Sequence, residues 1–575
     1  MKKLLAYLKP YKKETVISPL FKLLEAIFDL LVPLVIKEII DEGIVGGNTG
    51  AIWRWCGVLV TLAIVGLTCS LIAQYFAARA AVGFSTGLRR DLFAHIQRLS
   101  YAETDRVGTA TLVTRMTADI NQLQSGVNMT LRLFLRSPVI VLGAMIMAFI
   151  VEPRGAWPFV AVIPLLSVVV FTIMFKSVPL YKKVQQNLDR VTARTRENLT
   201  GVRVIRAFRK EQEEIDRFGE ANEAHNRIQN FVGKISALMN PLTLIVVNAG
   251  LIALLLSGAR LVTLGDMTQG DVVAMTNYMA QILVELVKFA NTIILVNKAI
   301  ACGNRIEAVL ETPAGMPTKN EAIESDNTDA VTFRNVSLTY AGHAAPSLQG
   351  IELHVPRGAT VGIIGSTGSG KTSAVNLIPR FYDVTEGCVL VNGKDVRAYK
   401  TEDLRERIAT VPQKAVLFRG TIRSNLLWGN PNATDEKLWD ALEAAQAKEF
   451  VEQKEGGLDA PVAQGGRNFS GGQRQRLTIA RALVRKAEIL ILDDSSSALD
   501  YATDAALRQA LADLPENPTV FLISQRTSSI QHADMILVLE EGQPAGLGTH
   551  EELLHSSPVY REIYESQFRK GGETA

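Results

Sequence analysis

The sequence predicts a multidomain membrane protein, with an all-α transmembrane domain of six helices followed by an α/β domain. The first half of the chain has long apolar runs with few charges, and the second half has the mixed polarity of an ordinary α/β domain. A helix that spans a membrane needs roughly 20 mostly apolar residues. Six stretches come near that length: 15–40, 55–80, 128–151, 156–178, 236–262 and 270–298.

The length of the chain and its composition set outer limits. The 575 residues suffice for several domains, and a net charge of +3 gives no indication of a nucleic-acid partner. Four cysteines are scattered without the spacing of a metal site or a disulfide framework, so we expect buried apolar thiols. They are Cys56, Cys69, Cys302 and Cys388.

The domain boundaries follow from changes in composition. We place the transmembrane domain at 1–304, a linker at 305–330 and the α/β domain at 331–575. The linker is polar, contains two prolines and has no periodicity. The next run, V-T-F-R-N-V-S-L-T-Y, alternates as a strand does.

Basic residues predict the orientation in the membrane. Lys and Arg collect at the N-terminus, around 89–115, around 182–217 and after 300. By the positive-inside rule these long segments and both termini are cytoplasmic. The basic N-terminus lacks a small-residue cleavage site, so we expect a short amphipathic helix on the inner membrane surface rather than a signal peptide.

Two long loops, 80–127 and 179–235, keep helical character. We therefore expect the spanning helices to continue into the cytosol, with short turn elements near 99–109 and 207–218. The alternative is a pair of solvated, charged hairpins, although hairpins of this length need a docking partner.

Ionisable residues inside the apolar stretches form a second group of candidates. Lys22, Glu25 and Asp29 share one helical face, and Glu285 lies three residues before Lys288. Charge in a membrane is costly, so these groups either pair with one another or face a polar cavity. Lys22 and Glu25 could also lie below the bilayer. The functional alternative is that Asp29 or Glu285 lines the path of a transported substrate.

The strongest motif is G-S-T-G-S-G-K-T at 365–372, between an apolar strand and a helix. This context predicts a phosphate-binding loop whose backbone N–H groups turn toward phosphate oxygens. Lys371 would reach the β- and γ-phosphates, and the Thr372 hydroxyl would hold Mg²⁺. Asp493, after the apolar run Ile489–Leu492, would complete this nucleotide site as the acidic residue at the end of a buried strand. The ATP-contacting residues are Gly365, Ser366, Thr367, Gly368, Ser369, Gly370, Lys371, Thr372 and Ser373.

A second glycine motif, N-F-S-G-G-Q, opens the helix R-L-T-I-A-R-A-L. A Ser-Gly-Gly at a helix start can bind an anion, although alone it is more simply a helix N-cap. One nucleotide does not need both the phosphate-binding loop and this second anion-binding motif from the same domain. We therefore expect a head-to-tail pair of domains, each offering this motif to the γ-phosphate of the other.

Together these motifs resemble the ATP-binding cassette (ABC) family, and six spans with one such domain resemble an exporter-type half-transporter. The resemblance implies a P-loop nucleotide-binding domain with a helical subdomain, and coupling helices in the two long loops. By family pattern Tyr340 stacks on adenine, Gln413 contacts Mg²⁺, and Asp500 lies in a loop at the dimer interface. The signature motif corresponds to Ser470, Gly471, Gly472 and Gln473, preceded by Phe469 where leucine is common.

Two positions depart from the hydrolytic pattern of the family. Asp494 replaces the catalytic glutamate, and Gln525 replaces the switch histidine. Asp494 is one methylene shorter, and a misplacement of about 1 Å can cost on the order of 100-fold in rate. Gln525 cannot carry a positive charge, and His532 lies two helical turns too far along the chain to replace it.

These departures resemble the degenerate-site subunit of a heterodimeric, multidrug-type exporter. The implied protein is a multi-pass translocase of the cell membrane with its nucleotide-binding domain in the cytoplasm, binding ATP and Mg²⁺. Its implied partners are a consensus-site half-transporter, membrane lipid and a hydrophobic or amphiphilic small molecule. An importer, a lipid or peptide translocator and a regulatory pseudo-ATPase subunit remain alternatives, and the motifs do not identify the substrate.

Overall fold

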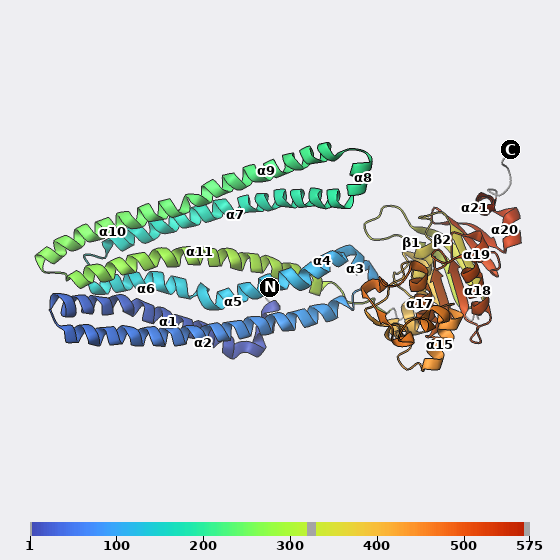
Figure 1. Cartoon of the computed structure of the whole chain (residues 1–575), viewed down its shortest axis with the longest axis horizontal. Coiled ribbons are helices and arrows are strands. Elements are labelled where there is room, and N and C mark those ends of the chain that lie inside the picture. The colour runs from blue at the N-terminus through green and yellow to red at the C-terminus, as the bar shows by residue number, and fades with distance from the viewer. Residues whose placement is uncertain (1–2, 319–328, 569–575) are drawn as a thin grey trace. The chain divides into compact units, whose positions relative to one another are not determined.

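The computed structural model describes residues 3–318 and 329–568, which form two compact units (Figure 1). The first unit comprises Met1–Gln97 and Ala110–Thr312, and the second comprises Arg98–Thr109 and Pro313–Ala575. A short segment from the first half of the chain therefore belongs to the second unit. Ten residues of the predicted linker, 319–328, lie outside the described residues.

Long helices make up the first unit. Its α-helices are α1 (Lys12–Glu38), α2 (Thr49–Ile96), α4 (Thr109–Thr114), α5 (Ile120–Met129), α6 (Arg136–Val151), α7 (Trp157–Thr200), α8 (Val202–Ala207), α9 (Glu211–Ala237), α10 (Met239–Leu264) and α11 (Gln269–Glu311). Shorter segments are the 3₁₀ helix η1 (Leu4–Tyr11) and the π-helices η2 (Ile39–Val45), η3 (Arg115–Asp119) and η4 (Thr130–Phe134). Helix α11 runs through the first residues of the predicted linker.

Within the described residues, five helical stretches are long and apolar enough to cross a membrane. They are Thr49–Ile96, Thr109–Val151, Trp157–Thr200, Glu211–Leu264 and Gln269–Glu311. Helix α1, which covers most of the first predicted span, is not among them. Lys22, Glu25 and Asp29 interrupt its apolar sequence, so composition alone does not mark it as a span.

Small side chains let α1 and α2 pack closely. Ala73, Ala77 and Ala80 on α2 are fully buried, and the Ser18 hydroxyl of α1 donates to the carbonyl of Ala73 at 2.9 Å. In a lipid environment, helices associate through close packing of small residues and through such interhelical hydrogen bonds. Helices α7 and α9 also run side by side, with α8 at the end of their hairpin (Figure 1).

The two predicted turn elements differ in outcome. The first coincides with helix α3 (Tyr101–Val107), which begins with Ser100 as its N-cap. The second was placed too late, because the transverse helix is α8 (Val202–Ala207) and residues 211–218 already belong to α9. Gly201 separates α7 from α8, and Glu211, Glu213 and Glu214 favour a new helix start at 211 through the helix dipole.

Over its described residues, the second unit is an α/β domain with three sheets. A six-stranded sheet has the order β12-β11-β3-β10-β9-β6, a four-stranded antiparallel sheet has the order β2-β1-β4-β5, and β7 pairs with β8. The strands are β1 (Val331–Leu338), β2 (Leu348–Val355), β3 (Thr360–Gly365), β4 (Glu386–Val391), β5 (Lys394–Asp395), β6 (Ile408–Val411), β7 (Gly420–Thr421), β8 (Pro461–Val462), β9 (Ile489–Asp493), β10 (Thr519–Ile523), β11 (Met535–Glu540) and β12 (Gln543–Gly548).

Three apolar clusters are buried in the described part of this unit. One lies between the two large sheets and includes Phe333 and Phe521. A second packs the helices around α15 and α17 against β6 and β9, and a third includes Ile364 and Tyr560. The helices of the unit, besides α3, are α12 (Lys371–Leu377), α13 (Thr401–Glu406), α14 (Ile422–Leu426), α15 (Asp435–Ala444), α16 (Lys448–Glu452), α17 (Gly471–Leu483), α18 (Tyr501–Ala512), α19 (Thr527–Ile530), α20 (His550–Ser556) and α21 (Pro558–Phe568). Short 3₁₀ turns occur at Val396–Ala398, Gly457–Asp459 and Gln464–Gly466.

Candidate nucleotide-binding site

A pocket of about 230 Å³ lies where three parallel strands of the large sheet end. Strands β3, β10 and β9 are adjacent and parallel, so the residues that follow them gather at one edge of the sheet. Ligands of open α/β sheets bind at this carboxyl edge. The pocket is lined by Ser347, Thr367, Gly368, Ser369, Gly370, Lys371, Thr372, Ser373, Gln413, Asp493, Asp494, Ile523, Ser524 and Gln525.

The glycine-rich loop turns tightly between β3 and α12. Gly370 has φ +93°, and a Cβ there would lie 2.7 Å from the carbonyl oxygen of Ser347, so a side chain is excluded. The loop wraps around Lys371, whose ammonium donates to the carbonyls of Gly365 (2.8 Å) and Ser366 (2.6 Å). Burial lowers the pKa of Lys371, against the raising effect of Asp494 and Asp493. The cation is thus held inside the loop that would receive phosphate.

Thr372 and Asp493 lie together at the base of the pocket. The Thr372 hydroxyl is 3.0 Å from each carboxylate oxygen of Asp493. Burial raises the pKa of Asp493, the Thr372 hydroxyl opposes that rise, and Asp494 adds to it. Gln413 lines the same pocket, and its amide carbonyl, the Thr372 hydroxyl and the Asp493 carboxylate are oxygen ligands, the type that Mg²⁺ prefers. The residues therefore fit the ion that the sequence predicts.

Asp494 and Gln525, the two departures from the hydrolytic pattern, both line this pocket. Asp494 follows β9 with a left-handed backbone, φ 48°, and its N–H donates to the carbonyl of Ile523 on β10 at 3.0 Å. Its carboxylate accepts a hydrogen bond of 3.4 Å from the Gln413 side chain. His532 lines a different pocket. The structure thus brings Gln413, Asp493, Asp494 and Gln525 to one place.

Tyr340, the predicted adenine-stacking residue, is tied to the phosphate loop. Its hydroxyl donates to the Ser373 hydroxyl at 2.9 Å. Its ring meets Tyr382 edge to face, with centroids 4.9 Å apart. The position of the aromatic platform is therefore fixed by contacts within the protein.

The signature residues Ser470–Gln473 form the start of α17. The Ser470 hydroxyl accepts from the N–H of Gln473, and the Gln473 side chain accepts from the N–H of Ser470, which completes a capping box. None of the described residues that line the nucleotide pocket belongs to this motif. Phe469 is 4% exposed and fills the helical core, which explains why an aromatic is accepted at this position.

Asp500 caps the next helix, α18. Its carboxylate accepts from both the N–H and the hydroxyl of Thr503, each at 2.9 Å. These hydrogen bonds lower the pKa of Asp500. The residue is thus an N-cap in this chain, which leaves any role at a dimer interface as a prediction.

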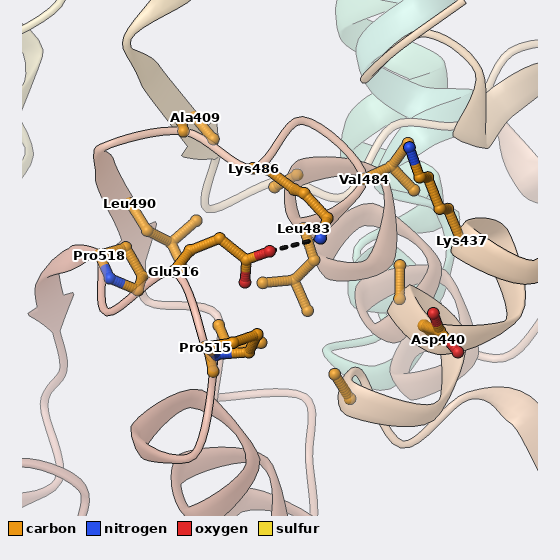
Figure 2. A pocket seen from close by; sticks show the side chains of 15 residues that line it. Ala409, Lys437, Asp440, Leu483, Val484, Lys486, Leu490, Pro515, Glu516 and Pro518 are labelled. Atoms are coloured by element: carbon orange, nitrogen blue, oxygen red, sulfur yellow. Dashed lines mark hydrogen bonds and ion pairs between the residues drawn. The ribbon is translucent and has the colours of Figure 1, made fainter. Parts of the chain in front are cut away.

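A second pocket, of about 280 Å³, lies in the same unit beside α15 and α17 (Figure 2). Alanine, leucine and proline side chains dominate its walls, and an ion pair between Lys486 and Glu516 lies at its edge (Figure 2). It offers no glycine loop for phosphate, so the nucleotide is assigned to the smaller pocket.

Helix α3 packs on the α/β domain through contacts that sequence reasoning missed. Tyr101 stacks on Phe381 with centroids 4.4 Å apart, and Arg405 lies over the Phe381 ring at 5.1 Å. The Tyr382 hydroxyl donates to Asp105 of α3 at 2.5 Å. No local motif marks Phe381 or Tyr382, because their partners lie far away along the chain.

In the helical unit, Asp29 and Glu285 are brought together by Arg136, which the sequence analysis did not single out. Arg136 donates to Asp29 and to Glu285 at 2.7 Å each. The predicted pairs also form: Lys22 reaches Glu25 at 2.6 Å, and Lys288 reaches Glu285 at 2.9 Å. The sequence does carry a signal for Arg136, because an arginine within the apolar stretch 128–151 needs an acidic partner.

Comparisons with known proteins agree with this arrangement. Residues 15–286 match the family model of the ABC transporter transmembrane region, and residues 348–497 match the ABC transporter model. An uncharacterised ABC transporter ATP-binding protein of Mycobacterium tuberculosis is 38% identical over 98% of this chain and 97% of its own length. The ATP-dependent lipid A-core flippase of Salmonella typhimurium is 29% identical over 97% of this chain and 96% of its own length.

A solved structure of a bacterial Atm1-family ABC exporter with ATP bound has the same fold. Its TM-score is 0.80 at 23% sequence identity, and the match covers 98% of this chain and 99% of that one. The membrane-spanning helices and the phosphate-loop domain together define an ATP-driven membrane transporter. The chain belongs to the ABC transporter family.

Proposed function

We propose that this chain is the degenerate-site subunit of a heterodimeric ABC exporter. The observation that carries the proposal is the presence of Asp494 and Gln525 in a pocket that otherwise keeps Lys371, Thr372, Asp493 and Gln413. The retained residues support ATP binding, and the two replaced residues weaken hydrolysis of the bound ATP at this site.

Both replacements act on the same chemical step. A general base must reach the attacking water within hydrogen-bond distance, and the shorter Asp494 falls short of it. Gln525 donates and accepts hydrogen bonds, but it places no positive charge beside the γ-phosphate. The loss from one such misplacement is on the order of 100-fold. Mg²⁺ held by Thr372 and Gln413 would supply charge neutralisation of the phosphates.

A second chain completes the proposal. The signature residues Ser470–Gln473 lie outside their own pocket, and in a head-to-tail pair they complete the nucleotide site of a partner with an intact glutamate and histidine. Exposed apolar residues support such a partner. Val204 and Phe208, at α8, are 60% and 73% exposed, and the stacked Phe418 and Trp428 are 45% and 62% exposed.

In the proposed membrane topology, α1 also crosses the membrane, which adds one span to the five that composition alone identifies. The ATP-binding domain lies on the cytoplasmic side of the cell membrane. The charges of α1 support this placement because they are compensated within the helical unit: Lys22 by Glu25, and Asp29 by Arg136. A paired intramembrane charge costs far less than an isolated one. The basic segments around 89–115 and 182–217 belong to the same side.

The transport cycle follows from the two unequal sites. ATP at both interfaces closes the ATP-binding domains, the helices α3 and α8 carry the closure to the spans, and the cavity opens outward. Hydrolysis at the partner's site resets the transporter. The substrate is hydrophobic or amphiphilic, which agrees with the lipid named for the Salmonella relative.

The test compares the purified chain with its Asp494→Glu/Gln525→His double variant, measuring ATP binding and single-site turnover. We expect both proteins to bind a fluorescent ATP analogue equally. The double variant should hydrolyse ATP at least about 10-fold faster, which would recover part of the roughly 100-fold rate loss expected from a misplaced base. Equal turnover, or rapid turnover by the unmodified chain alone, would contradict a degenerate site.

A further inference from the structure

A pocket of about 430 Å³ lies within the helical unit, between α1, α6 and α11. Its apolar wall consists of Val32, Pro33, Ile36, Ile140, Ala280 and Val284. Charged and amide side chains occupy the rest of the lining, so the pocket combines an apolar body with a few convergent polar groups. Ligand pockets generally have this composition.

The buried centre of the pocket is the Arg136 guanidinium, whose side chain is 11% exposed. It donates to Asp29 through Nη2 and to Glu285 through Nη1, each at 2.7 Å. Glu285 is 5% exposed and also accepts from Ser137 at 2.9 Å. The π-helix η4 (Thr130–Phe134) ends immediately before Leu135 and Arg136, and such π segments frequently occur at functional sites.

The network has two ends that reach the pocket. Asp29 is 42% exposed, and Arg136 engages only its Oδ2. Lys288 is 47% exposed and uses one donor on Glu285 at 2.9 Å. One carboxylate and one ammonium are therefore open to a ligand. Between them, Nη1 and Nη2 of Arg136 and both oxygens of Glu285 are engaged, whereas the buried Nε of Arg136 has no hydrogen-bond partner among the described residues.

A third polar group in the lining is an acceptor without a donor. The side-chain oxygen of Gln281 is buried and has no hydrogen-bond partner among the described residues. The amide nitrogen of the same side chain donates to the carbonyl of Asp29 at 3.5 Å. Leaving a buried acceptor unpaired is costly. Within the described residues, Oδ1 of Asp29 and Oε1 of Gln281 are thus two acceptors that a ligand with N–H donors can satisfy.

We propose that this pocket binds a zwitterionic amphiphile, with a primary ammonium on Asp29 and Gln281 and a nearby anionic group on Lys288. The proposal rests on the transporter function above and adds a class of substrate to it. The apolar wall receives the hydrocarbon part of the ligand. A primary ammonium is required because a quaternary one has no N–H to offer the two acceptors.

The charge of the network favours a ligand without net charge. Glu25, Asp29 and Glu285 are balanced by Lys22, Arg136 and Lys288. A ligand with a single charge would leave one uncompensated charge in a medium of low polarity, which is strongly unfavourable. A zwitterion keeps every charge paired, so it is selected over a simple cation or anion of equal hydrocarbon length.

The experiment measures binding of three probes to the full-length protein in alkyl maltoside micelles, without nucleotide. The probes are lysophosphatidylethanolamine, lysophosphatidylcholine of the same acyl chain, and Nε-dodecanoyl-lysine. We expect lysophosphatidylethanolamine to bind about tenfold or more tightly than lysophosphatidylcholine, as the loss of a charge-assisted hydrogen bond predicts. Its order relative to Nε-dodecanoyl-lysine separates a phospholipid head group from an amino-acid head group, and either order supports the proposal.

Three near-isosteric variants assign the preference to residues. Asp29→Asn and Gln281→Met should each abolish most of the preference for the ethanolamine head, whereas Lys288→Gln should weaken both lysophospholipids equally. Asp266→Asn, at an exposed ion pair with Arg154, is the matched control and should change neither affinity. Retained cooperative melting and ATP-analogue binding show that the variants are folded.

Equal affinity for the two lysophospholipids in the unmodified protein would overturn the proposal, as would a preference that survives both Asp29→Asn and Gln281→Met. Because binding is measured without ATP, either result leaves ATP-driven transport intact as a separate question. Failure of the proposed transporter function would instead appear as loss of ATP-dependent transport by the assembled pair while the binding preference persists.

Discussion

The hydroxyl of Tyr382 lies 2.5 Å from Oδ2 of Asp105, although the two residues are 277 positions apart in the sequence. The ring of Tyr382 also meets Tyr340, and the Tyr340 hydroxyl donates to Ser373 of α12. A continuous series of contacts therefore joins α3 to the helix that follows the phosphate loop. Tyr382 is thus the link in this series between α3 and Tyr340, the predicted adenine-stacking residue.

Tyr382→Phe keeps the ring and removes only the hydroxyl that binds Asp105. We expect ATP affinity to stay within about twofold, because the ring still supports Tyr340, while substrate stimulation of ATPase activity falls about fivefold, the equivalent of roughly 1 kcal/mol for one exposed hydrogen bond. The assay compares ATPase activity with and without substrate in the assembled pair. Tyr399→Phe, whose hydroxyl donates to the carbonyl of Val391, is the control. Unchanged stimulation in Tyr382→Phe would show that this contact does not transmit.

Lys371→Ala should weaken ATP binding roughly 10- to 100-fold, since the loop loses the charge-assisted hydrogen bonds that a phosphate would share. The measurement is equilibrium binding of a fluorescent ATP analogue. Lys400→Ala, at the N-cap position of α13, is the matched control with unchanged affinity expected. Similar affinity in both variants would place the nucleotide elsewhere.

Ser470→Ala should leave ATP binding by this chain unchanged and lower hydrolysis by the assembled pair, because Ser470 lies outside the chain's own pocket. Loss of the N-cap alone costs about 1 kcal/mol. Ser470→Asn retains a side-chain cap, so a similar loss of hydrolysis in both variants separates contact with the γ-phosphate from helix stability. A fall in ATP binding by this chain would mean that the motif acts within its own domain.

Phe469→Ala should destabilise the helical core by about 3–5 kcal/mol, whereas Phe469→Leu should cost less than about 1.5 kcal/mol. The reason is that Phe469 is 4% exposed and surrounded by the apolar side chains of that core. Thermal unfolding of the full-length protein with bound ATP analogue provides the measurement. If both variants melt alike, the phenyl ring does not fill the core as described.

Arg136→Gln should cost about 3–5 kcal/mol, since removal of one member of a buried ion pair leaves the other members uncompensated. Asp29 and Glu285 would both lose their partner. Arg154→Gln, at an ion pair where Arg154 is 72% exposed, should shift the melting temperature little. An equal shift in the two variants would contradict a structural role for Arg136.

Much of the nucleotide site was predictable from short-range patterns. The spacing of Gly365 to Thr372 encodes a loop by itself, and Asp493 ends a strand whose apolar run is visible in the sequence. Parallel strands β3 and β9 then bring these residues to one edge. The contacts that escaped prediction join residues far apart: Arg136 with Glu285, and Asp105 with Tyr382. No local periodicity reports such pairs, because they depend on how whole helices pack.

The error at α8 has a similar cause. The sequence after Gly201 continues with good helix formers, so the pattern predicts the turn in the charged stretch from 207. In the structure the helix breaks at Gly201 and again near Arg209, which has φ 54°. The first predicted span, in α1, does not meet the composition expected of a membrane-spanning helix because of its charged residues. Its charges are compensated by ion pairs, Lys22 with Glu25 on the same helix and Asp29 with Arg136 on α6, and a hydropathy measure cannot include such pairs.

Helix α2 contains 48 residues, which at 1.5 Å per residue make it about 72 Å long. The hydrocarbon core of a bilayer is about 30 Å thick, so more than half of this helix lies outside it. In a rigid helix of that length, a tilt of about 5° about one end displaces the other end by about 6 Å, slightly more than the roughly 5.4 Å rise of one helical turn. The length of α2 thus allows a small change of angle at one end of the helix to become a displacement of several ångströms at the other.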